Sequence, residues 1–105
     1  MDMETVRFLE EAACKRRIDI VNLIYQAQTG HIGGSLSSAD VLTALYYHVM
    51  DVEKIKAGNP DRDRFILSKG HSVEGFYSIL ADRGFFPREE LKTYAQFHTR
   101  LACHP

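Results

Sequence analysis

Residues 64–71 read RFILSKGH, and this short stretch decides the fold class that the sequence predicts. Residues 65–67 are a continuous apolar run, which is typical of a strand covered on both faces within a parallel sheet. The run turns directly into Lys-Gly-His, which opens the next helical pattern. In α/β proteins, ligands bind at the carboxyl ends of such strands. We therefore expect an α/β fold in which the chain is mostly helical and has about one strand, over residues 64–68.

Helical patterns account for most of the remaining sequence. Apolar residues recur at helical spacing over residues 4–28. Residues 51–63 contain Gly-Asn-Pro-Asp, a strong turn signal, and are expected to form a loop. Three further helices are expected, beginning near Ser37 or Ser38, spanning 72–83, and beginning at Pro87.

The 105 residues are expected to form a single domain, 1–105, that is incomplete. One strand cannot form a sheet alone, because its backbone groups would have no partners. The simplest explanation is that the chain is a piece of a larger α/β domain. A helix-only domain without a strand at 64–68 is the alternative.

Composition and charge exclude several classes of protein. Thirteen basic residues nearly balance fourteen acidic ones, so nothing in the charge favours nucleic acid as a partner. No apolar run has the length of a membrane span, and the acidic N-terminus lacks the apolar core of a secretory signal. Cys14 and Cys103 are far apart and are expected to be reduced thiols. These features predict a cytoplasmic protein without a membrane partner.

Two histidines stand where chemistry is common. His31 lies among three glycines in residues 29–38, TGHIGGSLSS, and glycine allows a backbone to approach a ligand closely. The alternative is a helix end and a turn, with His31 incidental. His71 follows the expected strand and opens a helix, whose N-terminus favours anions; the alternative is a simple helix cap. His48 is interpreted as a surface or packing residue.

Common site motifs are absent from the sequence. It has no phosphate-loop spacing, no GxGxxG and no HExxH. Cys103 and His104 are adjacent and too crowded to supply a tetrahedral metal site by themselves. A Cys–His pair for nucleophilic catalysis and a histidine-based metal protein remain as weaker alternatives.

Several stretches taken together resemble one family. Residues 30–50, GHIGGSLSSADVLTALYYHVM, precede residues 61–97, which begin DRDRFILSKGHSVEGFYSILADRG, and the chain ends in HP. This order resembles the N-terminal part of transketolase, in the form that is split into two polypeptides, from about residue 10 to 105. The resemblance implies the start of a thiamine diphosphate-binding fold, a parallel sheet covered by helices.

The resemblance also implies an activity and its partners. Transketolases move a two-carbon ketol unit from a ketose phosphate to an aldose phosphate, in the pentose phosphate pathway. They bind thiamine diphosphate between two α/β domains, with Mg²⁺ or Ca²⁺ on the diphosphate. The metal ligands belong to a GDG-type motif that is not among these residues, so no metal ligand is expected here. The C-terminal transketolase section is the expected partner chain, in a homo- or hetero-oligomer that uses sugar phosphate substrates.

Site residues follow from the resemblance, position by position. The catalytic residues it implies are His31, His71 and His104. Of these histidines, His31 and His104 would contact the substrate. His71 would lie against the cofactor, together with Gly33 and Gly70.

Two departures from the family pattern concern the sugar pocket. Cys103 stands where glycine usually precedes the final histidine, and His98 occupies another glycine-like position. They indicate that a modified sugar is a possible substrate. Because the chain lacks much of the family's N-terminal domain, we expect a fragment that is inactive alone. The alternatives are a non-catalytic helical interaction remnant and a related thiamine diphosphate enzyme acting on a modified sugar.

Overall fold

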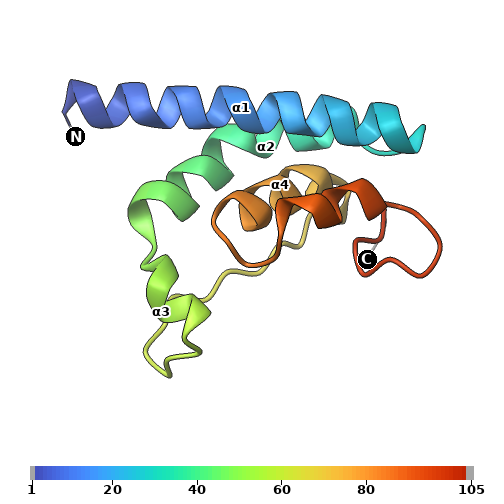
Figure 1. Ribbon diagram of the computed structural model, residues 1–105. Helices are drawn as coiled ribbons and strands as arrows, with labels where there is room; N and C mark the ends of the chain where they lie inside the picture. The colour runs from blue at the N-terminus through green and yellow to red at the C-terminus, as the bar shows by residue number, and fades with distance from the viewer. Residues whose placement is uncertain (1, 104–105) are drawn as a thin grey trace.

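The computed structural model describes residues 2–103, and these residues are predominantly helical (Figure 1). Helix α1 lies alongside α2, and α4 packs against both of them. The short helix α3 stands apart, on the long connection between α2 and α4. In chain order the helices are α1 (Met3–Ala27), α2 (Ile32–Ala44), a π-helical turn (Leu45–Val49), α3 (Val52–Lys56), a 3-10 turn (Gly70–Ser72), α4 (Val73–Asp82) and a 3-10 helix (Arg88–Thr93).

The first helix begins and ends within one residue of the prediction. Its N-cap is Asp2, whose carboxylate accepts a hydrogen bond of 2.7 Å from the backbone N–H of Thr5. Its C-cap is Gln28, which takes the left-handed conformation with φ 58°. The face toward the core carries apolar residues that include Ile20 and Leu23.

The second helix begins at Ile32, six residues before Ser38, so the prediction of a loop up to that point was wrong. The glycine pair therefore belongs to the first turn of α2. The hydroxyls of Ser37 and Ser38 both donate to the carbonyl of Gly34, at 3.0 and 3.1 Å. The serines consequently bond back along the helix instead of capping it.

The predicted strand over 64–68 is also wrong, because residues 2–103 contain no strand that could pair with it. The segment 62–69 is instead an extended connection without regular structure. Its side chains still alternate: Phe65 packs against Tyr46 and Phe76, whereas Ile66 is 85% exposed. The described chain is thus mostly helical and does not itself display an α/β sheet.

Two other predicted elements differ from the structure. The expected loop 51–63 contains α3, whose N-cap Asp51 accepts a hydrogen bond from the Lys54 N–H. The expected fourth helix is a 3-10 helix with Pro87 at its N-cap. The third helix agrees with the prediction over Val73–Asp82, after a 3-10 turn.

Apolar packing forms two buried clusters that share α4. Leu23, Val73, Tyr77 and Tyr94 belong to one cluster, which joins α1 to α4 and the C-terminal segment. The other cluster joins α2 to α4 around Ile79 and residues of the π-helical turn. Within residues 2–103, no helix is both long and apolar enough to cross a bilayer.

A polar network also fixes α1 against α4. Arg16 is only 5% exposed and contacts Asp19 at 3.2 Å and Asp82 at 2.7 Å. Asp19 also accepts hydrogen bonds from Ser78 at 2.7 Å and Arg88 at 2.9 Å. Burial raises the pKa of Asp19, but the hydrogen bonds from Arg88 and Ser78 outweigh it and leave the pKa below its ordinary value.

Candidate functional site

The structure brings together two of the three histidines that the sequence singled out. His31 is the N-cap residue of α2, and His71 lies in the 3-10 turn that precedes α4. Their ring centroids are 6.3 Å apart, with an edge-to-face angle of 69°. His104 lies outside the described residues. The short turn between α1 and α2 therefore faces the start of α4 across a pair of imidazoles.

The close approach of α2 to His71 depends on Gly34. A Cβ atom at Gly34 would lie 2.6 Å from the His71 carbonyl oxygen and 2.7 Å from its ring carbon Cδ2. By contrast, nothing lies within 4 Å of a Cβ placed on Gly33 or Gly70, the two glycines that the sequence analysis selected. Gly34 is therefore needed for packing, while Gly33 and Gly70 border open space beside the histidines.

Hydroxyl groups tie the turn that carries His71 to α2. Ser72 Oγ donates to the Gly34 carbonyl at 2.9 Å and lies 3.1 Å from Ser38 Oγ. Lys69 Nζ donates to Ser37 Oγ at 2.9 Å. Together these contacts fix the backbone on both sides of His71 against the first turns of α2.

Glu74 is the buried carboxylate of the site, and the sequence analysis missed it. Its exposure is 0%. Ser35 Oγ donates to Oε1 at 2.6 Å, the His31 backbone N–H donates to Oε2 at 3.1 Å, and the Tyr94 hydroxyl also donates to Oε2. The His31 ring atom Nδ1 lies 3.7 Å from Oε2. One side chain thus anchors the histidine turn, α2 and the C-terminal segment to α4.

A signal for Glu74 was present in the sequence. Helical spacing places Glu74 on one face with Ser78, with Gly75 next to that face, and small residues on a helix indicate a closely packed face. A glutamate on such a face must find donors inside the protein, because burying an unpaired carboxylate is costly. The large apolar residues of α4 predict its buried face, but they do not indicate that the Glu74 carboxylate needs hydrogen-bond donors.

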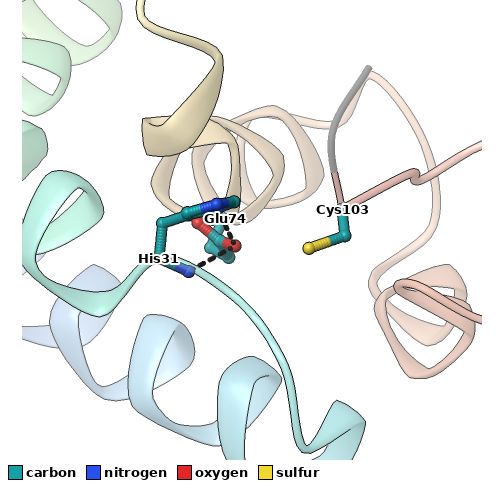
Figure 2. Close-up of side chains that lie close together, drawn as sticks. All are labelled: His31, Glu74 and Cys103. Carbon is teal, nitrogen blue, oxygen red and sulfur yellow. Dashed lines mark hydrogen bonds and ion pairs between the residues drawn. The ribbon is translucent and has the colours of Figure 1, made fainter.

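Cys103 completes a cluster with His31 and Glu74 (Figure 2). One ligand-type atom from each of the three side chains lies within 4.8 Å of the others. The thiol is partly buried and lies 3.9 Å from Thr29 Oγ1. Burial, followed by hydrogen bonding to Cys103 and Glu74, raises the pKa of Tyr94, so its hydroxyl remains protonated and donates. The residue that departs from the family's glycine therefore lies directly beside the histidine site.

The two remaining histidines differ in their surroundings. His48 is exposed near the end of the π-helical turn, as expected of a surface residue. His98 has φ 64°, in the left-handed region that favours glycine. This conformation matches the glycine-like position that the sequence analysis assigned to it.

Comparison with known proteins gives one consistent family. The domain described as "Transketolase, thiamine diphosphate binding domain" matches residues 9–105. The chain is 44% identical, over all 105 residues, to an apulose-4-phosphate transketolase subunit of Phocaeicola vulgatus and covers 36% of that protein. It is 47% identical over 75 residues, 71% of the chain, to a 6-deoxy-6-sulfo-D-fructose transketolase subunit of a Clostridium species and covers 27% of that protein. It is 32% identical over 104 residues, 99% of the chain, to mouse transketolase and covers 17% of it.

The chain therefore belongs to the transketolase family, within its thiamine diphosphate-binding N-terminal domain. It spans 36% or less of the length of these relatives.

Proposed function

We propose that this chain provides the substrate-facing start of the thiamine diphosphate site of a transketolase. The reaction moves a two-carbon ketol unit from a ketose phosphate to an aldose phosphate. The observation that carries the proposal is the pairing of His31 with His71, whose ring centroids are 6.3 Å apart, with open space next to Gly33 and next to Gly70. Family membership supplies the reaction type, and this pairing supplies groups that can exchange protons with a sugar.

The two histidines have distinct proposed roles. His31 is proposed to contact the sugar and to move protons, and the Glu74 carboxylate lies 3.7 Å from its Nδ1. His71 and the open space at Gly33 and Gly70 receive the cofactor. His104, which lies outside the described residues, is proposed to contact the substrate.

The residues present fit thiamine diphosphate in one specific respect. The positions beside Gly33 and Gly70 are open where a side chain would otherwise fill the space. When bound, the cofactor supplies the electron sink for breaking the bond next to the ketose carbonyl. A Mg²⁺ or Ca²⁺ ion on the diphosphate is part of the proposal, and we assign it no ligand within residues 2–103. Such hard cations prefer oxygen ligands.

Partners and location follow from the same proposal. The names of two relatives include "subunit", which supports a C-terminal transketolase section as the partner chain, in a homo- or hetero-oligomer. We propose a cytoplasmic location and sugar phosphate substrates. The Cys103 thiol beside His31 gives this pocket a side chain where the family pattern has glycine. A modified sugar is therefore the second candidate substrate, and the relatives named for apulose-4-phosphate and 6-deoxy-6-sulfo-D-fructose support it.

The test is ketol transfer by the assembled enzyme that contains this chain. The chain is combined with its C-terminal section and thiamine diphosphate, and the transfer rate is measured with ketose phosphate donors. We expect His31→Ala to lower kcat by about 100-fold or more, the size of a lost general acid–base group, and His71→Ala to weaken thiamine diphosphate binding and to lower the transfer rate with it. His48→Ala is the matched control, because His48 is exposed, and it should leave the rate unchanged.

Either of two results would contradict the proposal. Equal rates for the His31 and His71 variants and the His48 control would remove both residues from the catalytic site. An assembled protein that binds no cofactor and transfers no ketol unit would favour the non-catalytic interaction remnant. Activity with modified sugars only would select the second candidate substrate.

A further inference from the structure

We propose that His31, Glu74 and Cys103 form a binding site for a zinc-type divalent cation. One nitrogen, one oxygen and one sulfur ligand atom lie within 4.8 Å of one another (Figure 2). They come from three separate parts of the chain: the N-cap of α2, the first turn of α4 and the end of the C-terminal segment. The site shares His31 with the proposed sugar contact, but cation binding by these three side chains is measured without ketol transfer.

The ligand types select the metal. Thiolate, imidazole and carboxylate are the ligands of zinc and related borderline-soft ions, whereas Mg²⁺ and Ca²⁺ take oxygen ligands. A cation held by Cys103 is therefore chemically distinct from the ion expected on the cofactor's diphosphate. Three protein ligands leave one position of a tetrahedral zinc site for water.

Burial and charge favour a cation at this position. Glu74 is fully buried, and among residues 2–103 the one basic side chain that the structure places within 4.0 Å of its carboxylate is His31, at 3.7 Å. A bound divalent ion would balance the carboxylate and a Cys103 thiolate. Binding would release the thiol proton to solvent as the sulfur–metal bond forms, so the charges balance.

The surroundings already orient the carboxylate. Ser35 donates to Oε1, and the His31 N–H and Tyr94 hydroxyl donate to Oε2. A carboxylate has about four acceptor positions, so one remains for a metal. Hydrogen bonds of this kind hold a ligating carboxylate in place and are a usual part of metal sites. The His31 side chain is 38% exposed, so one edge of the site borders solvent, while its Nδ1 beside Glu74 is buried.

The geometry requires only a small adjustment. Atoms bound to one zinc ion at bond lengths of about 2.0–2.3 Å in a tetrahedron are about 3.5 Å apart. The ligand atoms now lie within 4.8 Å of one another, so the longest of these separations must shorten by roughly 1 Å. Cys103 lies in the irregular segment after the last helix, so this end of the site can supply the movement.

The experiment is titration of the reduced 105-residue chain with Co²⁺, a spectroscopic substitute for zinc. We expect a sulfur-to-cobalt charge-transfer band in the near ultraviolet that Zn²⁺ displaces. Cys103→Ser should abolish the band. Cys14→Ser is the matched control, because Cys14 is the other free thiol and is exposed on α1, and it should keep the band.

Two further variants keep the test decisive. His31→Ala should weaken Co²⁺ binding by about tenfold or more, while Tyr94→Phe, which loses a hydrogen bond to Glu74, should weaken it by about tenfold. Circular dichroism confirms that each variant is folded. If one of the two variants does not fold, the Co²⁺ affinity of the other is compared with that of the wild-type chain. The proposal is overturned by a band that follows Cys14, by no band in the folded wild-type chain, or by equal affinity in the folded His31 or Tyr94 variant.

Discussion

Removing the Glu74 carboxylate should cost more stability than any exposed acidic substitution in this chain. Its three donors are Ser35, the His31 N–H and the Tyr94 hydroxyl, and Glu74→Ala leaves all three without an acceptor. A buried donor left unsatisfied costs about 1–3 kcal/mol. We therefore expect the free energy of unfolding to fall by about 3 kcal/mol or more. Glu74→Gln keeps the shape and one acceptor oxygen, so it should cost about 1–2 kcal/mol.

Urea unfolding followed by circular dichroism measures this difference. A loss of about 3 kcal/mol corresponds to a midpoint lower by about 1–3 M for a protein of this size. Glu11→Ala is the control, because Glu11 is exposed on α1, and it should change stability by no more than about 0.5 kcal/mol. If Glu74→Ala is unfolded without urea, the urea midpoints of the other proteins still decide the question. The wild type and Glu11→Ala should have similar midpoints, and Glu74→Gln should have a lower one. A Glu74→Gln variant as stable as the wild type would refute the reasoning, because the charge-assisted hydrogen bonds would then contribute nothing.

Two other predictions concern close packing and charge. Gly34→Ala should lower the melting temperature, because its Cβ would lie 2.6 Å from the His71 carbonyl oxygen, at a cost of about 1–3 kcal/mol of stability. Gly33→Ala is the control: its Cβ meets open space, and alanine in the helix should add up to about 1 kcal/mol of stability. Equal melting temperatures for the two variants would contradict this steric account. Arg88 and its neighbours lower the pKa of Asp19, so this carboxylate stabilises the fold above about pH 4 and loses its contribution as the pH falls further. Asp19→Asn should therefore lower the urea midpoint more at pH 6 than at pH 3, and an equal effect at both pH values would count against the lowered pKa.

The sequence predicted α1 well because a long apolar periodicity and a side-chain cap are local properties. The start of α2 could not be read in the same way. Gly33 and Gly34 resemble a loop by composition, yet a helix there is stabilised by its packing against residues 70–72. That contact joins positions more than thirty residues apart in the chain. Tertiary packing thus overrides the low helix propensity of glycine.

The predicted strand over 64–68 shows what an apolar run can and cannot establish. The run does produce an extended backbone, and Phe65 turns inward as a strand residue would. Strand structure also needs neighbouring backbone groups, and the described residues supply none. For the candidate site, the resemblance selected His31 and His71, which the structure places as neighbours. It could not select Glu74, whose importance comes from donors on three other segments.

The alternation along residues 65–68 also determines which genetic changes the segment tolerates. Phe65 and Leu67 are partly buried, whereas Ile66 and Ser68 are exposed. Substitutions at the two outward positions leave the aromatic packing in place. A one-residue deletion or insertion reverses the two sets, because the period of an extended chain is two. It would also shift His71 relative to Gly34. We therefore expect this connection to accept a wide choice of outward residues but only one length.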